Sequence, residues 1–142
     1  MQRLRVGELR EGVWTRPSNL APDRLAEDMV IIESQCDVFT VMSSDTGLAG
    51  RLWDLDLWAE RAGALTKAMD ELTPRLSDGD VSALRPGFLV SAAALRHFLA
   101  DPLLPEPLEP RGWPGQSIRA VYDRYDTVYR ELLTNWILQA VA

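Results

Sequence analysis

The chain has 142 residues, of which 46% are hydrophobic and 25% charged, a balance typical of one globular domain or two small ones. The single cysteine excludes a disulfide scaffold, and no apolar run reaches the roughly 20 residues that a membrane span needs. The net charge of −6, with no basic run, makes the chain by itself a poor nucleic-acid binder, and without a signal-peptide core we expect a cytoplasmic protein.

The first part of the chain predicts short strands and one helix. Alternating side chains predict a strand over residues 12–16 that ends in a turn at Pro17. Residues 22–35 have apolar residues at helical spacing and predict a helix, although the β-branched run 29–32 also fits a strand. Residues 38–43 are apolar on both alternating faces and predict an interior strand.

The clearest predicted helix begins after Asp54, a good N-cap. Trp53, just before the cap, is placed to pack on Trp58 as a hydrophobic staple. Apolar residues then repeat at spacings of three and four, and we expect the helix to end at Pro74. The predicted apolar face contains Leu55, Trp58, Ala62, Leu65, Met69 and Leu72.

Two more helices are predicted, separated by a proline-rich arm. Pro86 fits the first turn of a helix that carries residues 88–100, and apolar side chains surround most of it, so we expect deep burial. Five prolines break regular structure across residues 101–115 and predict an extended arm that packs on its own domain. A last helix is predicted over residues 114–138.

The residues that could carry chemistry all have ordinary structural explanations. Cys36 and His97 are the only Cys/His pair, but both stand among apolar neighbours, as core residues do. Asp54, Asp56 and Glu60 form an acidic cluster, which the first turn of a helix favours without any metal. We therefore predict no catalytic residue, no metal site and no cofactor. Tyrosines and a tryptophan at helical spacing indicate a core or an oligomer seam: Tyr122, Tyr125, Tyr129 and Trp136.

Three stretches together resemble one known family. Residues 7–20 contain a strand with Val-Trp-x-x-Pro, in which Trp14 and Pro17 are the signature residues. Residues 52–62 open a helix with Trp53 and Asp54. The most specific stretch is 95–115, where Asp-Pro-x-Leu-Pro is followed by Trp-Pro-Gly. These motifs resemble the PaaX-like family of bacterial transcriptional repressors, whose hallmark falls here on Asp101, Pro102, Pro105, Trp113, Pro114 and Gly115.

The resemblance implies a three-part protein, with a winged helix for DNA, a ferredoxin-like middle domain and a helical C-terminal domain. The winged helix has no counterpart here, so we expect DNA to be contacted only through a segment that this chain lacks. The predicted fold class is α+β, with short antiparallel strands of a partial ferredoxin-like domain in residues 1–76. The helical C-terminal domain is predicted over residues 77–142, including the arm 101–115.

The resemblance also implies a homodimer that represses aromatic, phenylacetate-type catabolism and is released from DNA by an aryl-CoA thioester. Such a ligand carries phosphates and an aromatic ring, so arginines beside an apolar slot are sensible receivers. We predict Arg96 and Arg111 for the phosphates, with His97 and Trp113 lining the slot. The alternative is that the hallmark residues only fix the arm to the domain, with Asp101 accepting backbone hydrogen bonds.

Two other functions stay open on the sequence. One is a metal-dependent nuclease, because the middle domain of the family resembles the small CRISPR-associated endonuclease fold. The other is a purely structural dimerisation module in which the tyrosine-rich last helix joins subunits.

Overall fold

The computed structural model describes residues 4–19, 26–43, 45 and 47–141. The chain forms two compact units, and the first contains Met1–Leu55 together with Pro102–Arg111. The second contains Asp56–Asp101 and Gly112–Ala142. This division differs from the predicted boundary after residue 76, because the long helix that follows Asp54 joins the later helices. Within the described residues, no helix has the length and apolar character needed to cross a membrane.

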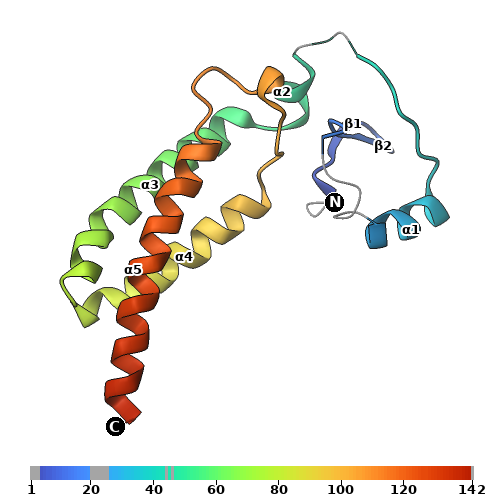
Figure 1. Ribbon diagram of the computed structural model, residues 1–142. Helices are drawn as coiled ribbons and strands as arrows, with labels where there is room; N and C mark the ends of the chain where they lie inside the picture. The colour runs from blue at the N-terminus through green and yellow to red at the C-terminus, as the bar shows by residue number, and fades with distance from the viewer. Residues whose placement is uncertain (1–3, 20–25, 44, 46, 142) are drawn as a thin grey trace. The chain divides into compact units, whose positions relative to one another are not determined.

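The first unit contains a small antiparallel hairpin (Figure 1) of β1 (Gly7–Arg10) and β2 (Val13–Thr15). Strand β2 confirms the predicted strand, whereas β1 was not predicted. Gly12, at a positive φ of 75°, turns the chain between the two strands, a conformation that suits glycine. The hairpin is the only sheet in the described part of the chain, so the protein is mostly helical and the expected ferredoxin-like domain is not shown.

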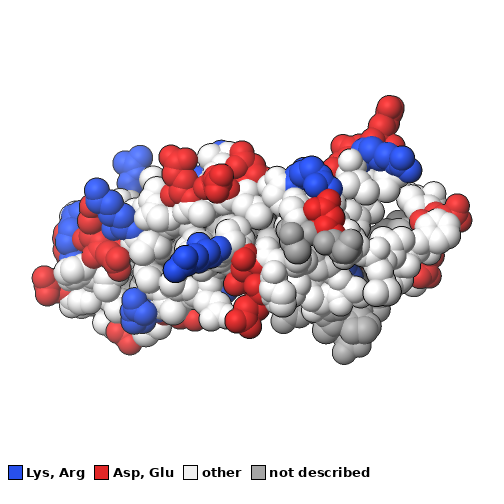
Figure 2. Space-filling model, turned by 90° about the horizontal axis from the view of Figure 1, so that it is seen from above, with Lys and Arg blue, Asp and Glu red and all other residues white. Residues whose placement is uncertain are grey.

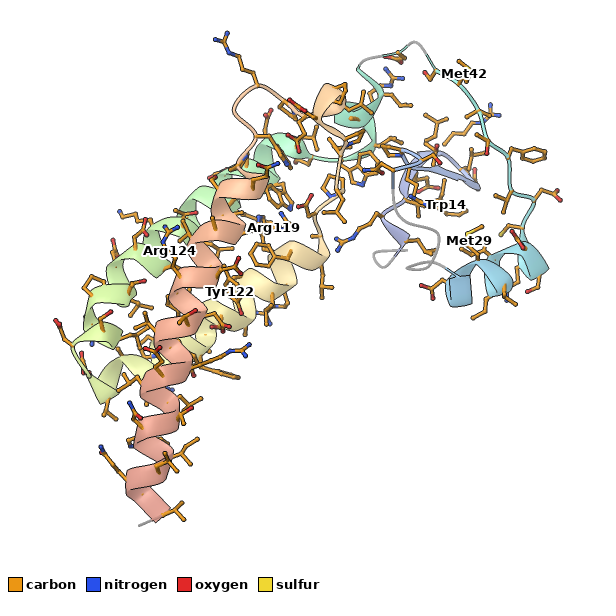
Figure 3. The ribbon with its side chains drawn as sticks, viewed as in Figure 1. Trp14, Met29, Met42, Arg119, Tyr122 and Arg124 are labelled. Carbon is orange, nitrogen blue, oxygen red and sulfur yellow. The ribbon has the colours of Figure 1, made fainter. Side chains whose placement is uncertain are left out.

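Helix α1 (Ala26–Gln35) lies inside the predicted helix, whose first four residues fall outside the described ones. The interior strand predicted over residues 38–43 is wrong. This segment has no strand assignment, and its large apolar side chains are 51 to 101% exposed: Val38, Phe39, Val41 and Met42, of which the last is labelled in Figure 3. A strand needs a neighbour for its backbone N–H and C=O groups, and local apolar pattern alone does not supply one.

A short helix, α2 (Leu48–Leu52), lies close to β1. A Cβ atom added at Gly7 would lie 2.7 Å from the Cβ of Leu52 and 3.2 Å from the Trp53 ring, so only glycine allows this close approach. The arm residues 102–111 belong to this unit and contain a single 3-10 turn, η4 (Glu106–Leu108). Leu104 is buried and Asn19 donates a hydrogen bond to the carbonyl of Leu103, as expected for an arm that packs on its own domain.

The second unit is a bundle of three helices (Figure 1): α3 (Leu55–Ser77), α4 (Leu84–Leu99) and α5 (Gly115–Val141). A 3-10 turn, η3 (Val81–Ala83), precedes α4 and is capped by Asp80, whose side chain accepts from the Ser82 N–H. The predicted end of α3 at Pro74 is wrong, because the helix continues for three more residues. Pro74 and Asp70 are both exposed, so the carbonyl that loses its N–H partner lies where water can reach it.

The core of the bundle draws on all three helices, and Tyr125 and Tyr129 of α5 are buried within it. The Tyr125 hydroxyl donates to the Gly87 carbonyl on α4 at 2.7 Å, which fixes these two helices against each other. Burial raises the pKa of Tyr125 to about 12, so the hydroxyl stays protonated and keeps donating. The buried members of the core are Trp58, Ala62, Met69, Leu72, Leu76, Ala83, Leu84, Ile118, Tyr125 and Tyr129.

Helix α4 corrects another expectation, because it is not buried all round. Its inner positions are mostly small, and Gly87, Ser91 and Ala94 are buried. Its large apolar residues instead lie at the surface, 51 to 62% exposed: Phe88, Leu89, Leu95 and Leu99. Small residues at the inner positions let α4 approach α5 closely, which leaves the large side chains for the other side.

Candidate functional site

Three aromatic rings from separate parts of the chain stack in the second unit. The Trp58 ring of α3 lies 4.2 Å from the ring centre of His97 on α4, with the planes 25° apart. The Trp113 ring, just before α5, lies 4.5 Å from the Trp58 ring at 22°. Trp58 and His97 are buried, while Trp113 is half-buried. The aromatic stack therefore has Trp113 as its most accessible member.

A buried ion pair lies in the same unit. Asp101 is 2% exposed, and its carboxylate accepts from Arg119 of α5 at 2.6 Å. Arg119 also donates to the Gly115 carbonyl at 2.8 Å, and its guanidinium lies 5.1 Å from the centre of the Phe98 ring. Arg119 and Tyr122 both come from α5 (Figure 3), and Tyr122 meets the edge of the same Phe98 ring. Arg119 thus holds together the end of α4 and the start of α5.

The electrostatics of His97 follow from this setting. Burial lowers its pKa below the usual value, Asp101 opposes the shift, and the positive charges of Arg61 and Arg119 add to it. His97 is therefore neutral near pH 7. Its Nε2 atom and the Nε1 atom of Trp58 are buried, and neither has a hydrogen-bond partner among the described residues. Two polar nitrogens in one aromatic stack are thus available to a polar atom of a ligand or to water.

The structure brings together two of the four predicted ligand residues, since His97 and Trp113 both stack on Trp58. Arg96 is exposed on α4, and Arg111 is exposed in the first unit. Sequence reasoning missed Trp58 as a member of the stack, because its spacing marked it only as core. It also missed Arg119, whose place four residues after Gly115 was the available signal.

The hallmark residues have clear structural roles. A Cβ added at Gly115 would lie 2.7 Å from Nε1 of Trp113, so glycine lets the ring lie against the start of α5. The Pro114 carbonyl accepts from the Ile118 N–H in the first turn of that helix. Pro102 is buried and Pro105 half-buried. Asp101, expected to accept backbone hydrogen bonds, pairs with the Arg119 side chain.

The remaining signature residues lie in the first unit. Trp53 lies beside Gly7 of β1, and Asp54 is exposed. Trp14 on β2 is 43% exposed, and Pro17 is half-buried. These placements give them no ligand-binding geometry of their own.

The rival chemistries receive no support from the geometry. Cys36 is exposed, whereas His97 is buried in the other unit. Within the described residues, no three His, Cys, Asp or Glu side chains lie close enough together to hold a metal ion.

Comparison with known proteins was decisive for the family. Residues 53–138 match the model of the PaaX-like protein C-terminal domain, which covers α3, α4 and most of α5. The chain belongs to this family. PaaX-like proteins are regulators rather than enzymes, so the stack and ion pair belong to part of a PaaX-like regulator.

A solved structure supports the same relationship. The uncharacterized protein Rv0674 from Mycobacterium tuberculosis is similar to this PaaX-like chain, with 36% sequence identity and a TM-score of 0.73. The similarity covers 92% of this chain but 51% of that protein, so the chain spans about half the length of its relative. A search of curated proteins gave no match.

Proposed function

We propose that this chain is the effector-sensing part of a PaaX-like transcriptional repressor of aromatic, phenylacetate-type catabolism, and that its effector is an aryl-CoA thioester. The observation that carries the proposal is the aromatic stack of Trp58, His97 and Trp113 inside the region that matches the family. In this proposal DNA is bound by a segment outside the chain. The net charge of −6 and the mixing of acidic and basic side chains on the viewed face (Figure 2) are consistent with that division.

The stack offers an aryl group a suitable surface. Trp113 is half-buried, so an aromatic ring can pack on its accessible side without unfolding the bundle. The buried nitrogens of Trp58 and His97 can satisfy a carbonyl oxygen such as that of a thioester. Arg61 lies close enough to influence the charge of His97, and it joins Arg96 and Arg111 as a receiver for phosphate.

The position of the stack along the chain also supports a switch. Residues 102–111 leave the second unit and return to it. The Asp101–Arg119 ion pair anchors the chain where it leaves, and the stacking of Trp113 on Trp58 anchors it where it returns. A ligand that displaces Trp113 therefore acts on the connection between the two units. An effector must favour one arrangement over another in this way to change DNA affinity.

The test is calorimetric titration with phenylacetyl-CoA and a panel of aryl-CoAs, using CoA and phenylacetate as controls. We expect saturable binding of at least one aryl-CoA. The variants R61A, R96A and R111A should each weaken it about tenfold, since losing one charge-assisted contact to phosphate costs about 1.4 kcal/mol. The matched control is R124A, because Arg124 is exposed on α5 and its guanidinium donates to the Ala120 carbonyl.

Two outcomes would contradict the proposal. A flat titration across the whole panel leaves the purely structural dimerisation module as the better explanation. Binding that R124A weakens as much as R61A would mean that the contacts are non-specific charge attraction.

A further inference from the structure

Helix α4 presents an apolar surface on the side away from its small residues. This α4 outer face consists of Phe88, Leu89, Leu95 and Leu99, each more than half exposed. Arg85 and Arg96 are exposed on the same helix, and α4 contains no acidic residue. Side chains three, four and seven residues apart share one side of a helix, so these groups form a continuous apolar stripe with basic flanks.

The C-terminal part of α5 is the second unpartnered surface. Helix α5 continues past the turn between α3 and α4 (Figure 1). Its last part, here called the α5 end, carries no charged residue from Leu132 to Val141. Large apolar side chains on it are 45 to 82% exposed: Trp136, Ile137, Leu138 and Val141. Because three of them are consecutive, they cover more than half of the helix circumference, a pattern typical of a buried helix.

The two surfaces are complementary in charge. A helix carries partial negative charge at its C-terminal end, where its last carbonyls lack partners. The last turn of α5 has no basic residue to balance it. The α4 outer face has two exposed arginines and no carboxylate, so it supplies the missing positive charge.

The two surfaces also match in length but do not meet within one copy. The ten residues of the α5 end span roughly 15 Å, and the stripe from Phe88 to Leu99 spans roughly 16 Å, at 1.5 Å per residue. Helix α5 is continuous from Gly115 to Val141 and contacts α4 on the side of Gly87, opposite the outer face. The α5 end therefore continues away from the outer face of its own α4.

We propose that a second copy of this chain covers both surfaces, with the α5 end of each copy seated on the α4 outer face of the other. The contact is reciprocal, as a two-fold dimer requires, and it buries both apolar surfaces of each copy. Neither surface contains an acidic residue, so the contact avoids the like-charge repulsion expected between other parts of two copies with a net charge of −6 each. The proposal does not depend on the identity of the effector.

The test uses site-specific cross-linking in a Cys36→Ser background, which removes the only cysteine of the chain. The single variants L95C and I137C, carrying tags of different mass, are oxidised separately and as a mixture. We expect disulfide-linked dimers in the mixture, in several-fold excess over either variant alone. The pair L99C and L138C repeats the test at other exposed positions, in case one substitution perturbs folding.

Light scattering across a concentration series supplies the second measurement. We expect the mass of a dimer, with L95K and I137K each weakening association at least 100-fold. V30K is the matched control, since Val30 is exposed on α1, outside both surfaces. A monomer mass at all concentrations would overturn the proposal. Dimers formed by L95C alone would replace it with an α4–α4 contact, and dimers formed by I137C alone with an α5–α5 contact. None of these outcomes alters the effector titration.

Discussion

The carboxylate of Asp101 is almost wholly removed from water, and Arg119 provides its charge partner. Removing one member of such a pair leaves an uncompensated charge, which costs more than the pair itself contributes. We expect Arg119→Ala to lower the free energy of unfolding by about 2–3 kcal/mol, because Arg119 is partly exposed and water compensates in part. Urea denaturation followed by circular dichroism measures this loss.

The control for Arg119→Ala is Arg130→Ala, which breaks the exposed pair between Arg130 and Asp126 on the same helix. Exposed pairs contribute little, so the expected loss is below about 0.5 kcal/mol. Adding Asp101→Asn to Arg119→Ala should recover part of the stability, since it removes the stranded charge. Equal losses for the two arginine variants would show that Asp101 is not held by Arg119.

His97 makes stability depend on pH in a definite direction. Its pKa in the folded protein lies below the unfolded value of about 6.5, chiefly because of burial. Between these values the unfolded chain binds more protons, so the free energy of unfolding falls as pH is lowered through about 6.5 and is constant above about 7.5. Denaturant unfolding at a series of pH values measures this slope.

The chain has a single histidine, so His97→Gln should remove the slope between pH 7.5 and 5.5. The carboxylates act at lower pH. Hydrogen bonds from the Arg51 side chain to Asp45, and from Ser82 to Asp80, lower the pKa of each carboxyl, and their contribution is lost only below about pH 4. A slope that survives the substitution would assign the proton uptake to another group.

Among the helices, the contact between α4 and α5 depends on a missing side chain. A Cβ at Gly87 would lie 3.0 Å from the Tyr129 ring and 3.1 Å from the Tyr125 hydroxyl, and both tyrosines are buried. We expect Gly87→Ala to lower the free energy of unfolding by about 1–2 kcal/mol, because overpacking exceeds the gain in helix propensity. Thermal unfolding followed by circular dichroism is the measurement.

Gly63→Ala is the matched control, since Gly63 lies within α3 and an added Cβ would meet no atom within 4 Å. Here only the helix propensity changes, and we expect a gain of about 0.5–1 kcal/mol. If both substitutions were stabilising, α5 would not approach α4 as closely as described.

The helices show how far local pattern predicts structure. The spacing of apolar residues predicted α3 and α5 nearly to their ends, because each helix keeps one apolar side over many turns. It mispredicted the orientation of α4, whose large and small apolar residues cannot be told apart by hydrophobicity alone. The interior strand over residues 38–43 failed because a sheet depends on a distant partner, which a local pattern does not reveal.

Across the whole molecule, the limits of the sequence lie in contacts between distant segments. The family motif indicated that residues 101–115 form a unit with α5, and the Asp101–Arg119 pair and the Trp113 stack agree with this. The division into two units was not predicted, because residues 102–111 join a part of the chain more than 46 positions earlier. The stack itself unites three segments, so spacing along one helix did not reveal Trp58 as a site residue.

The unbroken course of α5 gives the second unit a stiff lever. Arg119 holds the helix near one tip, and Val141 lies roughly 33 Å farther along the axis, at 1.5 Å per residue. Pivoting α5 by about 5° at that hinge would swing its far tip by roughly 3 Å, enough to break side-chain packing there. A small adjustment around Trp113 is therefore amplified into a large movement at the opposite extremity of the same rod.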